Sequence, residues 1–311
     1  MFKSQLFGTL FALLMLFGAG TLHAAPRSPA PLAGEWNGLA SGDEIGFYDF
    51  QSASFNLCKQ RFSTTTPLDC VQYPTPGWYT GEPLMGRWSA LDTHARPALY
   101  DPSSGQIYLF SYSDCLPDQC FAFGGLSFSA VISTGLVNAV PVVGDRDGSG
   151  VDSIALLTTE RLKRNGPLVT TARLLADGLL RIQQSFQVNF DRGSETVIAG
   201  DWPGTSRAGD SLGFYHRSNR VLRLYDGSTQ VAALPVPFYP GDLQAVGGAW
   251  PLGPGFALYL PSNCQESLCH RPLYFFLSHS GQSLLLFQEP PLHPHVDPIF
   301  PDDPGGPGGG G

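Results

Sequence analysis

The stretch of sequence best suited to chemistry is Gly144-Asp145-Arg146-Asp147-Gly148-Ser149-Gly150-Val151-Asp152-Ser153. Oxygen-bearing side chains stand at alternate positions and glycines permit a tight wrap, which is the pattern that binds a hard cation such as Ca²⁺. The predicted ligands are Asp145, Asp147, Ser149, Asp152 and Ser153, together with a carbonyl near Val151. An EF-hand is excluded because its closing Glu is replaced by Leu156. The alternative is an Asp/Gly turn whose side chains cap their own backbone.

This segment belongs to a unit that recurs five times. Each copy begins with an apolar pair, a Gly, one variable residue and usually a Trp, and an apolar or aromatic pair follows farther on. The anchor glycines, about 50 residues apart, are Gly34, Gly86, Gly144, Gly200 and Gly248. Two landmarks that keep their register over five copies indicate a repeat architecture.

Each copy holds about four short apolar runs separated by Gly, Pro, Asp and Ser, which is typical of strands and turns. Four strands in a unit of about 50 residues predict an all-β, five-bladed β-propeller of four-stranded antiparallel blades. The segment closest to a helical pattern, Val169 to Ile182, has Asp177-Gly178 at its centre and is better interpreted as a hairpin. We expect one domain over residues 26–290, with repeats 31–81, 82–138, 139–196, 197–242 and 243–290.

The repeat puts acids and tryptophans in equivalent places. Glu35, Asp145 and Asp201 each follow an anchor glycine, so they are the candidate acids of a carbohydrate-active hydrolase or lyase working at the propeller funnel. Repetition alone also explains their shared position. Four Trp residues hold one repeat position, where they either stack on sugar rings or pack between blades; they are Trp36, Trp88, Trp202 and Trp250.

Three strings, GDRDGSGVDSIALL, GDWPGTSRAGDSLGFYHRSNRVLRL and ALYDPSSGQIYLF, resemble bacterial FG-GAP/VCBS-type repeats, the integrin-α-like propeller blades. The resemblance spans roughly Pro31 to Pro290. It implies that the Asp-rich loop of copy three binds Ca²⁺ through Asp145, Asp147, Ser149 and Asp152 or Ser153. It also implies extracellular binding or adhesion, without implying one activity.

The chain ends and the cysteines predict the compartment. Residues 1–25 resemble a secretory signal peptide, with an apolar run from Leu6 to Phe17 and small residues after it. Residues 291–311 are rich in Pro and Gly and are expected to be disordered. The six cysteines suit an oxidising compartment, and their locality favours the disulfides Cys58–Cys70, Cys115–Cys120 and Cys264–Cys269. We therefore expect a secreted or periplasmic protein.

The net charge of −8 argues against nucleic acid and anionic membranes as partners. No apolar stretch after the leader is long enough to span a bilayer. The combined prediction is a monomeric, non-enzymatic binding or adhesion propeller for an extracellular glycan or protein, with one Ca²⁺ loop. The alternative function is the hydrolase or lyase, and a third interpretation is a purely structural surface protein.

Overall fold

The computed structural model describes residues 27–36, 43–58, 70–76, 79–113, 125–161, 168–176, 181–202, 205, 209–236, 244–250, 253–259, 273–277 and 284–287. Several sequence predictions fall outside these ranges. They are the signal peptide, the C-terminal tail and the pairs Cys115–Cys120 and Cys264–Cys269.

Within the described residues the chain is all-β and its strands form five four-stranded sheets. The first sheet holds β1 (Ala30–Gly34), β2 (Glu44–Asp49), β3 (Ser54–Cys58) and β4 (Cys70–Pro74). The second holds β5 (Glu82–Gly86), β6 (Arg96–Asp101), β7 (Gln106–Tyr112) and β8 (Leu126–Ser133). The third holds β9 (Val140–Gly144), β10 (Ser153–Arg161), β11 (Leu168–Ala176) and β12 (Arg181–Val188). The fourth holds β13 (Glu195–Gly200), β14 (Ser211–His216), β15 (Val221–Asp226) and β16 (Thr229–Pro235). The fifth holds β17 (Gln244–Trp250), β18 (Gly253–Tyr259), β19 (Leu273–Leu277) and β20 (Leu284–Phe287).

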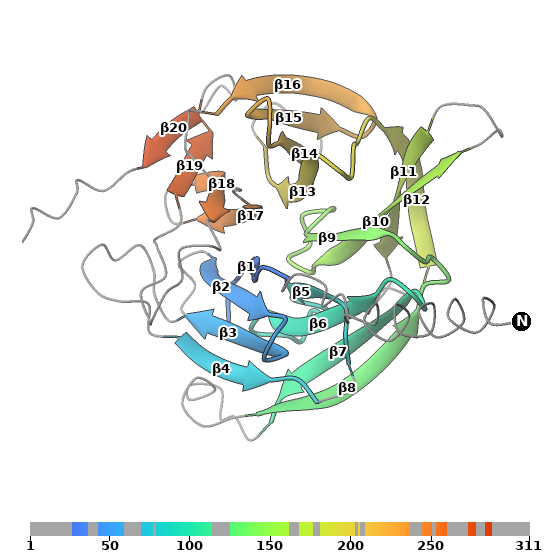
Figure 1. Ribbon diagram of the computed structural model, residues 1–311, viewed down its shortest axis with the longest axis vertical. Coiled ribbons are helices and arrows are strands. Elements are labelled where there is room, and N and C mark those ends of the chain that lie inside the picture. The colour runs from blue at the N-terminus through green and yellow to red at the C-terminus, as the bar shows by residue number, and fades with distance from the viewer. Residues whose placement is uncertain are drawn as a thin grey trace, which may run out of the picture.

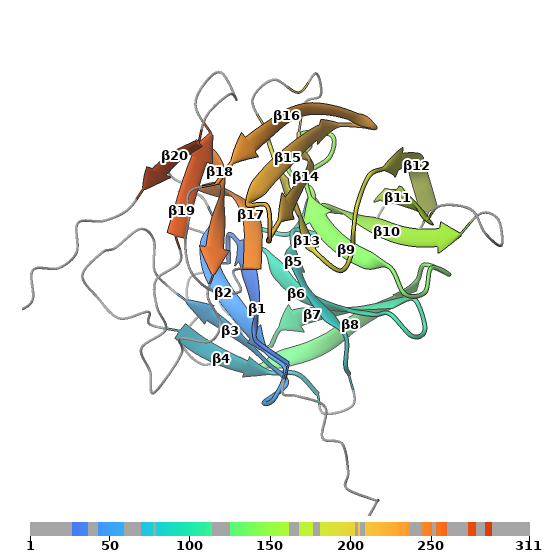
Figure 2. The ribbon, with the colours of Figure 1, turned by 45° about the horizontal axis from the view of Figure 1, so that its top comes forward.

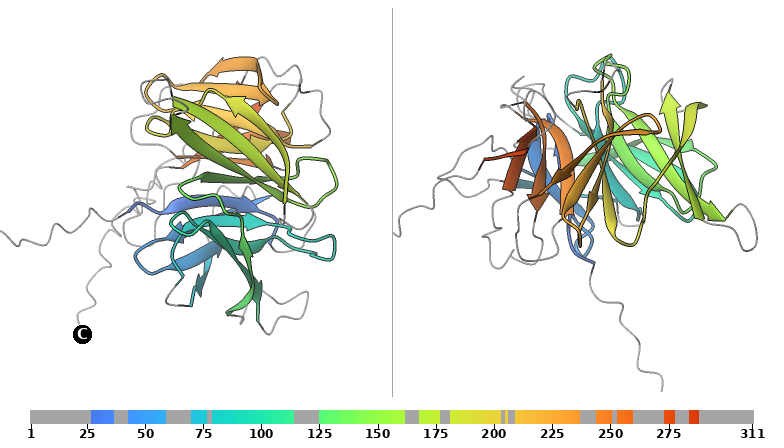
Figure 3. Two further views of the ribbon diagram at one scale, coloured as in Figure 1. Left: turned by 90° about the vertical axis from the view of Figure 1, so that its right-hand side faces the viewer. Right: turned by 90° about the horizontal axis from the view of Figure 1, so that it is seen from above.

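The sheets stand around a common axis in a propeller-like ring (Figure 1). Every sheet is a meander in which consecutive strands pair antiparallel, and its first strand is the innermost. The innermost strands contact one another in the order β1, β5, β9, β13 and β17, and β17 contacts β1. The tilted and side views show the sheets fanning outward from this axis (Figures 2 and 3). The prediction of antiparallel four-stranded sheets in a propeller-like arrangement is thus confirmed.

Burial follows the position of a strand within its sheet. The second strands are buried on both faces because a neighbouring sheet packs against each side, and β6 and β14 accordingly carry runs of buried residues. The outermost strand β8 is mostly exposed. Apolar residues in the second strands therefore run almost without interruption, whereas those of an outer strand alternate with serine.

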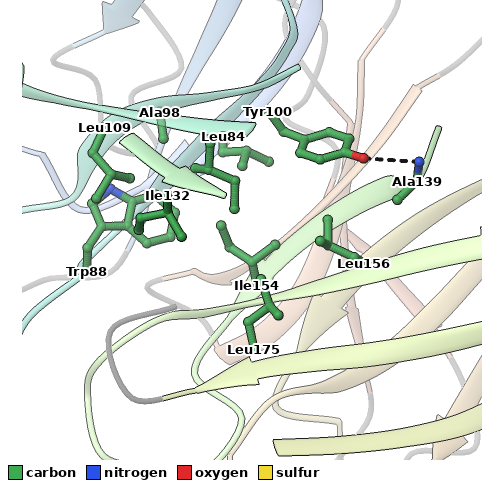
Figure 4. Packing of buried hydrophobic residues seen from close by; sticks show 11 residues of the cluster. Leu84, Trp88, Ala98, Tyr100, Leu109, Ile132, Ala139, Ile154, Leu156 and Leu175 are labelled. Carbon is green, nitrogen blue, oxygen red and sulfur yellow. Dashed lines mark hydrogen bonds between the residues drawn. The ribbon is translucent and has the colours of Figure 1, made fainter. Parts of the chain in front are cut away.

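The hydrophobic core is divided into clusters, each shared between adjacent sheets. Between the second and third sheets, Leu84 and Trp88 pack with Ile154 and Leu156 (Figure 4). The buried Tyr100 fastens the same region, since its hydroxyl donates to the Leu136 carbonyl at 2.6 Å and accepts from the Ala139 N–H at 3.2 Å. One repeat cannot bury its apolar faces alone, so the sheets depend on their neighbours.

The strands account for several local predictions. Residues 169–176 lie in β11 and residues 181–182 in β12, and these two strands pair antiparallel; Asp177-Gly178, the predicted hairpin turn, lies outside the described residues. Sheet four begins at Glu195, slightly before the expected boundary at 197. The predicted Cys58–Cys70 disulfide is present and joins β3 to β4. Among the described residues, no helix has the length and apolar character needed to cross a bilayer.

Candidate functional site

The tryptophans of the repeated loops are buried between sheets. Trp36 is 0 % exposed and packs with Met85 and Leu99 of the second sheet. Trp88 packs against the third sheet, and Trp202 packs with Phe256 of the fifth. Rings in these positions cannot stack on sugars, so the structure supports the packing interpretation for these three residues. The side chain of Trp250 lies outside the described part of the chain.

The anchor glycine is required because the tryptophan ring folds back over it. A Cβ at Gly200 would lie 2.5 Å from the Trp202 ring, and one at Gly86 would lie 2.7 Å from the Trp88 ring. The indole N–H of Trp36 donates to the Cys58 carbonyl at 3.1 Å, and that of Trp88 donates to the Arg96 carbonyl at 3.0 Å. The Gly-Xaa-Trp signature therefore reflects packing of the tryptophan between sheets. Its middle residue, which is Glu35, Arg87 or Asp201, then lies beside the axial cavity.

A cavity of about 490 Å³ lies on the axis of the ring. Its walls come from the innermost strands β1, β5, β9, β13 and β17. The three predicted acids Glu35, Asp145 and Asp201 all line it. They lie together at the end where the innermost strands finish, as their shared repeat position required.

Three further acids line the same cavity: Asp43, Asp152 and Asp210. Each directly precedes the second strand of its sheet, close to the anchor glycine across the β1–β2, β9–β10 or β13–β14 pair. Asp43 and Asp210 were not among the predicted site residues. A comparison of the residues preceding the second strand in each copy would have found both. Among the described lining residues, six are acidic and Arg87 alone is cationic, which makes this end of the cavity strongly acidic.

Two of these acids tie adjacent sheets together. Asp152 of the third sheet accepts the Arg87 N–H through Oδ2 at 2.7 Å, and its own N–H donates to the Arg87 carbonyl at 2.7 Å. Asp210 of the fourth sheet makes the same pair of bonds with Asp145, at 2.9 and 2.5 Å. Between the first and second sheets, Ala95 holds the position of these aspartates and has no carboxylate. Its N–H still donates to the Glu35 carbonyl, at 2.6 Å, so the backbone bond of the pair is kept.

The third copy has Arg146 where the others have tryptophan. Its Nη1 donates to the Asp210 carbonyl at 3.3 Å. The arginine therefore lies at the junction of the third and fourth sheets, where its positive charge faces the acids. Gly209 completes this contact with a φ of +100°, and a Cβ there would lie 2.5 Å from the Asp145 carbonyl oxygen.

Burial changes the protonation of the two junction acids. For Asp152, desolvation is the main cause that raises the pKa to about 6; the bond from the Arg87 N–H opposes it, and the charges of Asp210 and Asp145 add smaller increases. For Asp210, desolvation likewise raises the pKa to about 6, opposed by the Arg146 charge and the Asp145 N–H. Two carboxyls that titrate near neutrality beside other acids are the kind of group from which acid–base chemistry is built.

The predicted Ca²⁺ loop adopts a self-capping turn. The carboxylates of Asp145 and Asp147 both accept the Ser149 N–H, at 3.0 and 3.1 Å, and Asp145 also accepts the Gly150 N–H at 2.7 Å. The Ser149 hydroxyl accepts the Val151 N–H, and the Ser153 hydroxyl donates to the Gly144 carbonyl. The oxygens of Asp145 and Asp147 therefore converge, as a cation site would require.

Asp152 does not join that convergence, because its carboxylate bonds to Arg87 in the neighbouring sheet. Bonds from Ser149 are the main cause of a lowered pKa at Asp147, which keeps its carboxylate ionised. In the part of the chain that the structure describes, no three His, Cys, Asp or Glu side chains gather at metal-binding distances. Ca²⁺ binding by this loop stays a prediction.

Neither the protein-family models nor the curated proteins contain a match to this chain. The resemblance to FG-GAP/VCBS-type repeats is therefore supported only by the motifs quoted above. The geometry of the axial cavity is the basis for inferring a function.

Proposed function

We propose that the chain forms a five-bladed β-propeller that acts as a secreted, non-enzymatic binding or adhesion module, and that its axial cavity takes a positively charged group of a partner protein. The observation that carries this proposal is the convergence of six carboxylates and one arginine on one cavity. A lysine or arginine side chain of a partner would find complementary charge there. The signal-like leader and the Cys58–Cys70 bond support an oxidising compartment.

The geometry favours an inserted side chain over a flat contact. The acids line a cavity of about 490 Å³ rather than an open face, and three anchor their loops through backbone bonds formed by Asp145, Asp152 and Asp210. Fixed carboxylates lose little conformational entropy when a ligand binds, which favours affinity. Repulsion among the acids would also fall when a cation enters.

A charge-matched pair of double variants tests this function. Glu35→Gln with Asp201→Asn removes two lining charges and keeps the carboxylates of Asp152 and Asp210, which join adjacent sheets. Glu160→Gln with Asp226→Asn removes two charges outside the cavity lining. Binding of hexalysine is measured by calorimetry at two salt concentrations. We expect the cavity variant to weaken binding roughly tenfold or more, equivalent to ~1.4 kcal/mol. Equal weakening in both variants, or no binding by the wild type, would refute the proposal.

One observation favours the hydrolase or lyase as a second candidate. Asp210, with its pKa raised to about 6, lies near Asp145 and Asp201, which contribute to that shift. A carboxyl that holds its proton beside ionised carboxylates can act as a general acid while a neighbour acts as base or nucleophile. Turnover of a glycoside substrate that Asp201→Asn abolishes, with an unchanged melting temperature, would establish this function in place of simple binding.

A further inference from the structure

An aromatic surface lies at the outer edge of the second sheet. This edge is opposite the innermost strand β5, which lines the axial cavity. The rings of Tyr79 and Phe128 are nearly parallel, at an interplanar angle of 7° and a centroid separation of 5.7 Å. Tyr79 also contacts Tyr108, at 4.7 Å between centroids. Phe128 is 46 % exposed and Val131 is 48 % exposed, on the outermost strand β8. We name Tyr79, Tyr108, Phe128 and Val131 the rim platform.

Strand pairing places these side chains on one face and holds them there. Phe128 pairs with Phe110 and Val131 pairs with Tyr108, so these strand residues project from the same side of the β7–β8 ribbon. Tyr79, from the segment before β5, packs against Tyr108 and Phe128. Phe110 is fully buried in the cluster between the first and second sheets and contacts Tyr79 at 5.6 Å. The exposed Phe128 ring therefore rests on a fixed aromatic base.

The described segments that form β7, β8 and β9 carry no charged side chain of their own. Residues 102–113 and 125–144, which include β7, β8 and β9, contain no Asp, Glu, Lys, Arg or His, although the whole chain has a net charge of −8. Hydroxyl and amide groups stand there instead. The Tyr108 hydroxyl donates to Gln106 Oε1 at 2.6 Å, and Ser127, Ser129 and Ser133 are exposed along β8.

We propose that the rim platform binds a neutral saccharide chain. The exposed Phe128 ring, backed by the stacked Tyr79 ring, offers an apolar surface for the C–H face of a pyranose ring, and the hydroxyl and amide groups nearby can bond the sugar hydroxyls. The lack of charge disfavours ionic polymers, while an exposed apolar patch rimmed by polar groups marks an interaction surface. This site is separate from the axial cavity and does not depend on the function proposed for it.

Affinity electrophoresis in native gels tests the proposal. The gels contain one soluble polysaccharide each: starch, galactomannan, xyloglucan or laminarin as neutral probes, and polygalacturonate as a charged one. We expect at least one neutral polymer to retard the wild type and polygalacturonate to have no effect. Phe128→Ala should raise the apparent Kd for that polymer roughly tenfold, while Phe128→Tyr should keep the affinity. Thermal melts show that both variants remain folded.

Val231→Ala is the matched control, because Val231 is 42 % exposed on β16, the outermost strand of the fourth sheet. It should bind like the wild type. The proposal is overturned if none of the neutral polymers retards the protein, or if Phe128→Ala binds as the wild type does. It is also overturned if light scattering shows a dimer that Phe128→Ala converts to a monomer, since a second copy would then occupy the surface.

Discussion

The Asp210 carboxylate of the fourth sheet accepts the backbone N–H of Asp145 in the third at 2.9 Å, and the Asp210 N–H donates to the Asp145 carbonyl at 2.5 Å. Asp210→Asn keeps an acceptor oxygen and removes the buried charge. We expect it to unfold at the same or a higher denaturant concentration than the wild type at pH 7.5. Asp210→Ala leaves the Asp145 N–H without its acceptor and should cost about 1–3 kcal/mol. Urea unfolding of the two variants decides this, and equal stability would show that the bond contributes nothing.

The raised pKa values of Asp152 and Asp210 predict how stability changes with pH. Both lie at about 6, above the ordinary value of 3.8, so the folded protein binds these protons more tightly than the unfolded chain. Their contribution to stability is therefore complete below pH 4 and is lost as the pH rises through 6. We expect these groups to add about 1–3 kcal/mol between pH 7.5 and pH 5. The double variant Asp152→Asn with Asp210→Asn should lack this increment in urea titrations at the two pH values.

Gly200 has no room for a side chain beneath Trp202. A Cβ there would lie 2.5 Å from the ring, so Gly200→Ala must displace a buried tryptophan. We expect a loss of about 1–3 kcal/mol in the free energy of unfolding. Gly193→Ala is the control, because its nearest new contact is 3.4 Å away in an exposed turn. Thermal melts that show equal effects at the two positions would contradict this account of the repeat.

The Ca²⁺ prediction for the third copy can be tested through folding. A cation that binds only the native loop must raise its stability. We expect 5 mM CaCl₂, a concentration of about 10⁻³–10⁻² M that suits weak extracellular sites, to raise the Tm relative to a chelator. Asp147→Asn should remove this Ca²⁺-dependent rise in Tm and should leave the Cys58–Cys70 disulfide intact. An unchanged Tm in the wild type would rule the site out.

The Cys58–Cys70 disulfide closes a short loop, with a sequence separation of 12 residues. A loop of this size is expected to stabilise the folded state by about 2–3 kcal/mol, mainly by constraining the unfolded chain. The double variant Cys58→Ser with Cys70→Ser should therefore melt at a lower temperature under non-reducing conditions. A reductant should lower the Tm of the wild type by more than it lowers the Tm of the variant, because only the wild type has Cys58–Cys70 to lose.

The sequence predicted the strands well because the spacing of the apolar residues agrees with their burial in the first four copies, where the structure describes it. The Gly200-Asp201-Trp202 pattern marks the end of an innermost strand, and Leu222 and Leu224 mark a buried one. The site was predicted only in part. The shared repeat position of Glu35, Asp145 and Asp201 indicated that they would meet. The roles of Asp152 and Asp210 were missed because their partners, Arg87 and Asp145, belong to the preceding copy, and single-copy motifs carry no information about contacts between copies.

The tryptophans show the same limit. Their equivalent positions allowed both an exposed and a buried ring, and only the neighbouring sheet distinguishes the two. The rim platform was also not predicted, since Tyr79, before β5, and Phe128, in β8, are far apart in the sequence and meet only in the folded sheet. The burial of the tryptophans and the formation of the rim platform both depend on contacts between distant segments, which a local sequence pattern does not reveal.

Each sheet is assembled from one uninterrupted length of chain, and β1 meets β17 by side-to-side contact rather than by sharing a sheet. The circle therefore has no privileged starting point. New termini placed in any connection between consecutive sheets, with the old ends linked, would preserve every hydrogen-bonded ladder. By the same reasoning, duplication or deletion of one gene segment would add or remove a whole sheet, so the number of sheets can change in evolution without redesigning any of them.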